Sequence, residues 1–122
     1  MLSNRYHQAI PLLEKAITQK NDFSHLHLNL AICYRKTGYP NKSIEYFNSA
    51  LAINPKLHGA YYNRSIVYSR LGEYEKSKTD LEQLANSSDP EAELFFIELT
   101  FFLENGFERN STKPFGIVEK IS

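Results

Sequence analysis

The chain has 122 residues, enough for one domain that buries roughly two thirds of its unfolded surface. Its 14 basic residues balance its 14 acidic residues, which argues against nucleic acid or an anionic membrane as a partner. The single cysteine, Cys33, excludes an internal disulfide and lies on an apolar helical stripe, so we interpret it as a buried structural thiol.

The first predicted helix covers residues 6–20, where apolar side chains recur at helical spacing. Pro11 would lie about one turn after this start, where proline costs a helix least. The opening residues lack the apolar core of a secretory signal, and the most apolar run, residues 94–103, is too short to cross a bilayer. We therefore expect a soluble, cytoplasmic protein.

Residues 24–57 contain the clearest motif, a pair of helices joined by a tight turn. Gly38 can adopt the left-handed conformation that closes a helix, and Pro40 suits the first turn of the next one. Apolar stripes precede and follow this turn, and Asn54-Pro55 ends the second stripe. The segment is predicted to be a helical hairpin.

The same pattern returns 34 residues later, in residues 58–91. The equivalent pairs are Asn29 and Asn63, Tyr34 and Tyr68, Gly38 and Gly72, Ser43 and Ser77, and Phe47 and Leu81. The predicted helix at 6–20 matches the second helix of this unit, without its partner helix. We interpret this as a chain that starts inside a repeat array or is a piece of a longer protein.

Within the second hairpin, Arg64 occupies the position that matches Leu30 of the first hairpin, 34 residues earlier. Asp80 lies on the following helix at a height where it could face Arg64. We predict an ion pair between them; the alternative is that Arg64 extends its guanidinium to water.

A third unit begins at Asp89-Pro90-Glu91, a helix-start signature, and its first helix runs to Gly106. This helix is apolar nearly all round. We expect Phe95, Leu99 and Phe102 to point inward and Phe96, Ile97 and Leu103 to lie on other faces. Something must then cover the helix: either residues 107–122, with Phe115, Ile117 and Val118 as anchors, or another subunit.

The 34-residue register resembles the tetratricopeptide repeat. The matching positions in the first hairpin are Leu30, Ala31, Tyr34, Ser43, Phe47, Ala50 and Pro55. The resemblance implies an all-α fold, a right-handed superhelical stack of antiparallel helix hairpins (an α-solenoid). It would form a single domain over 1–122, with a partial repeat at 1–23, full repeats at 24–57 and 58–91, and a degenerate repeat or cap at 92–122.

In that family, the first helices of successive repeats line a concave groove that binds peptide segments of other proteins. Carried onto this chain, the groove residues are His25, Leu28, Asn29, Ile32, Lys36, Tyr62, Asn63, Ile66, Arg70 and Phe96. The amides of Asn29 and Asn63 could satisfy the backbone of an extended peptide. The alternative is a structural or oligomerising segment that stacks on further repeats or on a second copy.

Catalytic and metal chemistry are not indicated by the sequence. The histidines His7, His25, His27 and His58 lack the helical spacing that directs two imidazoles at one metal. The sequence also contains no glycine-rich phosphate loop and no nucleophile elbow. We therefore expect no enzyme activity, no cofactor and no metal.

Overall fold

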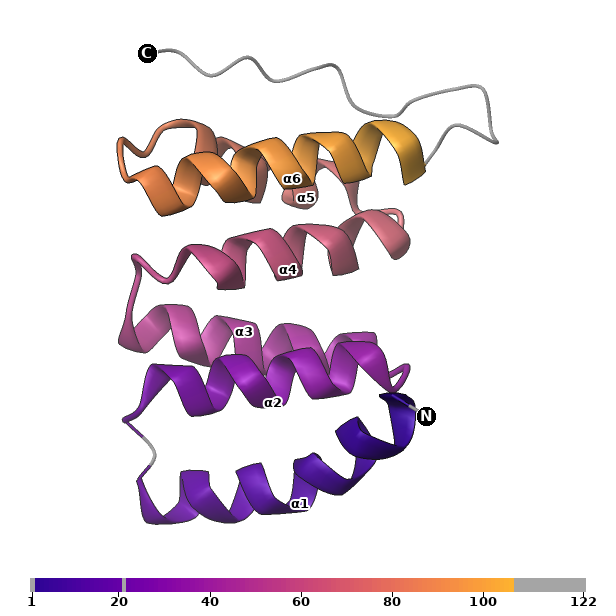
Figure 1. The fold of residues 1–122 in the computed structure, drawn as a ribbon, viewed down its shortest axis with the longest axis vertical. Coiled ribbons are helices and arrows are strands. Elements are labelled where there is room, and N and C mark those ends of the chain that lie inside the picture. The colour runs from indigo at the N-terminus through magenta and orange to yellow at the C-terminus, as the bar shows by residue number, and fades with distance from the viewer. Residues whose placement is uncertain (1, 21, 107–122) are drawn as a thin grey trace. The chain divides into compact units, whose positions relative to one another are not determined.

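The computed structural model describes residues 2–20 and 22–106, and within these ranges it is entirely helical and contains no strand. The helices are α1 (Leu2–Gln19), α2 (Ser24–Lys36), α3 (Pro40–Ile53), α4 (His58–Arg70), α5 (Tyr74–Ala85) and α6 (Pro90–Gly106) (Figure 1). The predicted all-α class and its helical hairpins are confirmed. The predicted fold-back of residues 107–122 lies outside the described residues.

The chain divides into two compact units, one up to Ala60 and the other from Tyr61 onward. In the first unit, α2 packs against both α1 and α3. Residues with no exposed surface in the α2–α3 hairpin are Leu30, Ala31, Ser43, Phe47 and Ala50. The small side chains among them allow the two helices to approach closely around Phe47.

The turn between α2 and α3 follows the sequence prediction. Gly38 has a positive φ of 90°, and the N–H of Tyr39 donates a hydrogen bond of 2.9 Å to the carbonyl oxygen of Tyr34. This bond satisfies a carbonyl that the end of α2 would otherwise leave without a partner. Pro40 begins α3, where its missing N–H costs nothing.

Helix α1 corrects the predicted start, because it begins at Leu2 rather than at residue 6. Pro11 is therefore in the interior of the helix and not in its first turn. Proline has no N–H to donate to the carbonyl of His7 and its ring crowds that turn, which bends a helix. Figure 1 shows α1 bent along its length.

The second unit closes its first hairpin in the same way. Gly72 has a φ of 79°, and the N–H of Glu73 donates a 2.9 Å hydrogen bond to the carbonyl of Tyr68. Where α4 meets α5, Ser65 and Ser77 exchange hydrogen bonds: each Oγ donates to the other residue's carbonyl, at 2.9 and 2.8 Å. Both serines are fully buried. Two helices can approach this closely only with small side chains at the contact.

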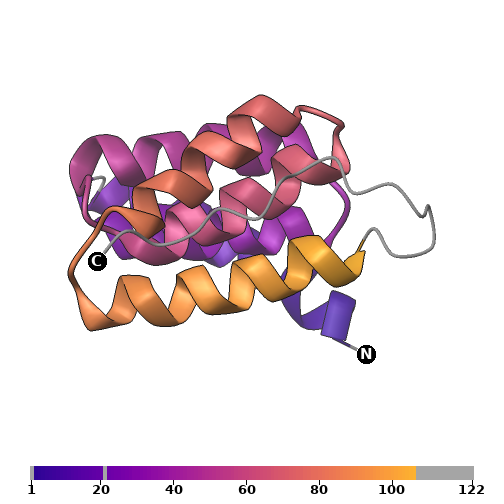
Figure 2. The same cartoon turned by 90° about the horizontal axis from the view of Figure 1, so that it is seen from above.

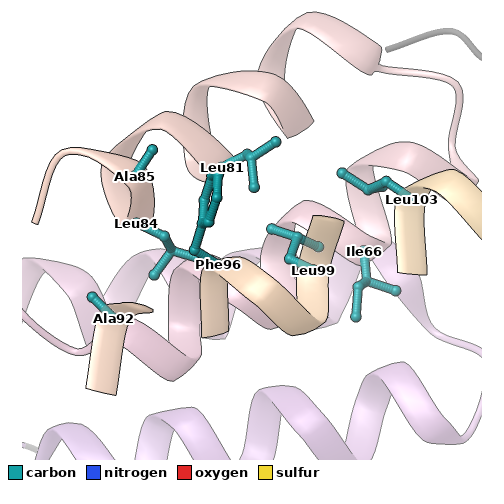
Figure 3. Close-up of a cluster of buried hydrophobic side chains, with 8 residues drawn as sticks. All are labelled: Ile66, Leu81, Leu84, Ala85, Ala92, Phe96, Leu99 and Leu103. Carbon is teal, nitrogen blue, oxygen red and sulfur yellow. The ribbon is translucent and has the colours of Figure 1, made fainter. Parts of the chain in front are cut away.

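The core of the second unit lies between α5, α6 and Ile66 of α4 (Figure 3). The buried face of α6 consists of Ala92, Phe96, Leu99 and Leu103. This corrects the predicted inward face: Leu99 is buried as expected, but Phe95 and Phe102 are only partly buried. Figure 3 shows Phe96 directed toward Leu81 of α5. Because α6 is apolar on several faces, the periodicity of its sequence does not show which face is buried. The contact with α5 determines it.

Candidate functional site

The first unit has an open groove between α1 and α2. It has a volume of about 490 Å³ and is lined by Arg5, Tyr6, Ala9, Leu12, Leu13, Asn29, Ile32 and Cys33. Leu12 is 70% exposed and adds a large apolar side chain to the wall of this groove. The Asn29 amide offers a donor and an acceptor beside this apolar surface. The groove can therefore hold apolar side chains and one polar backbone group.

Tyr34 fixes α1 against α2 beside this groove. Its hydroxyl donates a 2.7 Å hydrogen bond to Oε2 of Glu14, and its ring stacks on Tyr46 at 5.7 Å between centroids. Burial and the hydrogen bond to Glu14 raise the pKa of Tyr34 to about 12. The hydroxyl thus stays protonated and remains a donor through the physiological pH range.

Cys33 lies in the groove wall but only 5% of its surface is exposed. Burial raises the pKa of the thiol, which keeps it protonated and weakly nucleophilic. The prediction that Cys33 is buried is confirmed.

The second unit has its own groove, with a volume of about 610 Å³. It is lined by Tyr62, Ile97, Glu98, Phe101, Phe102 and Asn105. The Tyr62 ring packs against Phe95 at 5.1 Å between centroids, and the Arg70 guanidinium lies over the Phe102 ring at 5.4 Å. Aromatic side chains, those of Tyr62, Phe101 and Phe102, make up half of the residues that line this groove.

The predicted groove residues fall into three groups. Asn29 and Ile32 line the groove of the first unit, and Tyr62 lines that of the second. His25, Lys36 and Arg70 are exposed and Leu28 is partly buried, but none of these four lines either groove.

The third group, Asn63, Ile66 and Phe96, is buried, with exposed fractions of 8%, 3% and 9%. Ile66 and Phe96 belong to the core of the second unit. A ligand at the surface would reach little of these three side chains.

Several lining residues were not predicted. The side chains of α1, such as Tyr6 and Leu12, were missed because the first predicted helix was assigned only as the second half of a repeat. Phe101 was missed because the apolar run of α6 offers several equivalent faces. Its position relative to Ile97, one helical turn earlier, was the available signal.

The predicted pair of Arg64 and Asp80 is confirmed in the second unit. Nε of Arg64 donates to Oδ2 of Asp80 at 2.9 Å, and Nη2 donates to Oδ1 at 2.6 Å. The rings of Tyr61 and Tyr68 lie 5.7 and 5.8 Å from the guanidinium carbon. Asp80 is 1% exposed; burial raises the pKa of its carboxyl, and the adjacent Arg64 guanidinium opposes that effect. This is a structural ion pair inside a hairpin, away from either groove.

Among the described residues, no group of three or more His, Cys, Asp or Glu side chains is placed to hold a metal ion. None of the helices that the structure describes is both long enough and apolar enough to span a membrane.

Comparison with protein families assigns the repeats. Models of the tetratricopeptide repeat match residues 24–57 and, in a shifted register, residues 46–79. Residues 24–79 are therefore tetratricopeptide repeat sequence.

Among individual proteins, the chain is similar to the photosystem I assembly protein Ycf3. It is 29% identical to the protein of Cyanophora paradoxa over 97 residues, 80% of this chain and 49% of the relative. It is 32% identical to that of Prochlorococcus marinus over 90 residues, 74% of this chain and 50% of the relative. A peptidyl-prolyl cis-trans isomerase of Arabidopsis thaliana, PASTICCINO1, is 37% identical over 59 residues, which are 48% of this chain and 9% of the relative. The chain spans about half the length of the Ycf3 relatives that it matches.

Proposed function

We propose that this chain is a non-catalytic interaction module that binds a peptide or partner protein through its helical surface. The observation that carries the proposal is the open groove between α1 and α2, where the predicted Asn29 and Ile32 meet the exposed Leu12. The repeat family and the similarity to assembly proteins support a role in contacting other proteins. The predicted cytoplasmic location stays a prediction.

The groove chemistry suits an extended or helical segment with one or two apolar side chains. Leu12 and Ile32 would contact these side chains, and the Asn29 amide would pair with the backbone of the segment. One amide contact contributes only about 0.5–1.5 kcal/mol, so we expect affinities in the micromolar range. Lys36, exposed at the end of α2, would favour acidic side chains in the ligand.

The experiment begins with the full chain, labelled and applied to an array of random-sequence peptides. The best ligand is then titrated by fluorescence anisotropy against the chain and its variants. We expect Leu12→Lys to weaken binding roughly tenfold or more, because it places a charge in the apolar groove. Asn29→Ala should weaken it roughly threefold to tenfold.

The matched control is Ile53→Lys, since Ile53 is a 40% exposed apolar residue at the end of α3 that does not line the groove. It should bind like the unaltered chain. A ligand whose affinity survives Leu12→Lys, in protein with an unchanged circular dichroism spectrum, must use another surface and would refute the groove assignment.

The second candidate is a structural segment that associates with its own copies. The observation that favours it is the number of exposed large apolar side chains, among them Leu12, Leu94 and Phe101 at 65–70%. In that case the grooves would be filled by a second copy of the chain, and peptides would compete with self-association.

A further inference from the structure

Helix α6 carries an exposed apolar stripe on the side that does not face α5. Leu94, Ile97 and Phe101 are 65%, 57% and 67% exposed. Their spacing of three and four residues puts them on one face, which is distinct from the buried face of Ala92, Phe96, Leu99 and Leu103. Figure 2 shows α6 alongside α5, with no described helix of the second unit on its far side. We call Leu94, Ile97 and Phe101 the α6 stripe.

The stripe continues into the groove of the second unit. Ile97 and Phe101 line that groove together with Tyr62, Glu98 and Asn105. An apolar side chain that lies against the stripe can therefore insert between the rings of Phe101 and Tyr62. The surface is a ridge with an adjacent hollow, which is the shape that the apolar face of a helix recognises.

The charged residues of α6 itself all have one sign. The acidic residues of α6 are Glu91, Glu93, Glu98 and Glu104, and the helix contains no Lys, Arg or His. Helical spacing places Glu91 and Glu98 along one border of the stripe, and Glu104 along the other border, one turn from Phe101. Glu91 and Glu98 are exposed and Glu104 is partly exposed.

The helix dipole adds to this negative field. The last turn of α6 has no basic residue to compensate its partially negative carbonyl end, which is the end nearest Phe101. A cation does lie near α6: the Arg70 guanidinium stands over the ring of Phe102. Phe102 lies one helical turn after Glu98 on the same side of the helix, so the Arg70 guanidinium lies at the border of Glu91 and Glu98 and leaves the Glu104 border in place.

We infer that the α6 stripe is a docking site for a basic amphipathic helix of another protein, with apolar residues against Leu94, Ile97 and Phe101 and Lys or Arg against the glutamates. The apolar stripe supplies most of the affinity, and the glutamates orient the partner and exclude acidic ones. This surface is separate from the α1–α2 groove and prefers the opposite charge. The inference therefore goes beyond the proposed groove and does not depend on it.

The test uses the full chain and two synthetic 18-residue helical peptides. Both carry leucines at helical spacing on one face; the first has lysines on both borders of that face, and the second has glutamates there. Titration by fluorescence anisotropy at low and high salt gives both affinities. We expect the lysine peptide to bind at least roughly tenfold more tightly than the glutamate peptide, with an advantage that falls as salt rises.

Variants locate the binding. Phe101→Ala should weaken binding of the lysine peptide roughly tenfold or more. The double change Glu91→Gln with Glu98→Gln should weaken this binding roughly fivefold and remove much of its dependence on salt. The control is Glu75→Gln with Glu82→Gln, a double change of two exposed glutamates on α5, which should bind like the unaltered chain.

Three results would overturn the inference. The first is equal affinity for the two peptides, and the second is binding that Phe101→Ala leaves unchanged. The third is that the full chain does not bind the lysine peptide at all. This result would overturn the inference even if another part of the chain or a second copy occupied the stripe. Leu12→Lys separates the two proposals, because it should weaken binding in the α1–α2 groove and leave binding of the lysine peptide unchanged.

Discussion

The charged residues Arg64 and Asp80 stabilise the hairpin of the second unit. Arg64 and Asp80 form two hydrogen bonds in a fork geometry, and the rings of Tyr61 and Tyr68 lie against the guanidinium. Because Asp80 is almost fully buried, either charge alone would lack compensation. The sequence predicted this pair because two oppositely charged residues occupied positions that face each other across a hairpin.

We predict that Asp80→Ala and Arg64→Leu each lower the free energy of unfolding by about 3–5 kcal/mol. Combining Arg64→Leu with Asp80→Leu should recover much of the loss, since no unpaired charge then remains. Chemical denaturation monitored by circular dichroism measures all three. If each single variant is as stable as the original chain, the pair contributes nothing, despite its geometry.

Tyr34 gives a pH-dependent prediction. The pKa of its hydroxyl is about 12 in the folded chain, above the ordinary value of 10, because burial and Glu14 disfavour the phenolate. Its contribution to stability is complete below pH 10 and is lost as the pH rises toward 12. Absorbance titration should show one fewer tyrosine with a high pKa in Tyr34→Phe than in the original chain. If Tyr34→Phe and the original chain show the same number of tyrosines with a high pKa, the raised pKa belongs to another tyrosine.

At the scale of helices, the sequence predicted what local chemistry determines. Gly38, Pro40, Gly72 and Asp89 set helix ends, and the structure has each end where the sequence placed it. The predicted start of α1 was wrong because the helix begins at Leu2 and includes Ser3 and Asn4, residue types that usually cap a helix start and do not lie inside the first turn. The inward face of α6 was wrong in part because several of its faces are apolar, and only the packing of Phe96 on α5 distinguishes them.

Pro11 gives the prediction at this scale. Pro11→Ala restores an N–H that can donate to the carbonyl of His7 and removes the clash, so it should raise the free energy of unfolding by roughly 1–3 kcal/mol. The bend also sets Arg5 and Tyr6 relative to Leu12 in the groove, so the straighter helix should bind an array-selected peptide more weakly. Pro11→Ala that binds as tightly as the original chain would show that the bend does not shape the site.

At the scale of the whole molecule, the candidate site was predicted only in part. Asn29, Ile32 and Tyr62 line grooves in their respective units. Asn63 and Ile66 are buried, whereas Asn29 is exposed. The 34-residue period did not predict this difference, because burial depends on the neighbouring helices and not on the position within the repeat. The α6 stripe required the structure, since the sequence alone did not show which face α5 would cover.

The central claim is that these open apolar surfaces receive a different protein and not a second copy of the chain. Light scattering of the full chain over a wide concentration range tests it most directly, with Leu12→Lys and Phe101→Ala measured in parallel. We predict the monomer mass of 14.1 kDa for all three proteins at every concentration. A mass that rises toward a dimer with concentration, and returns to the monomer value in either variant, would contradict the claim and identify that surface as a contact between copies.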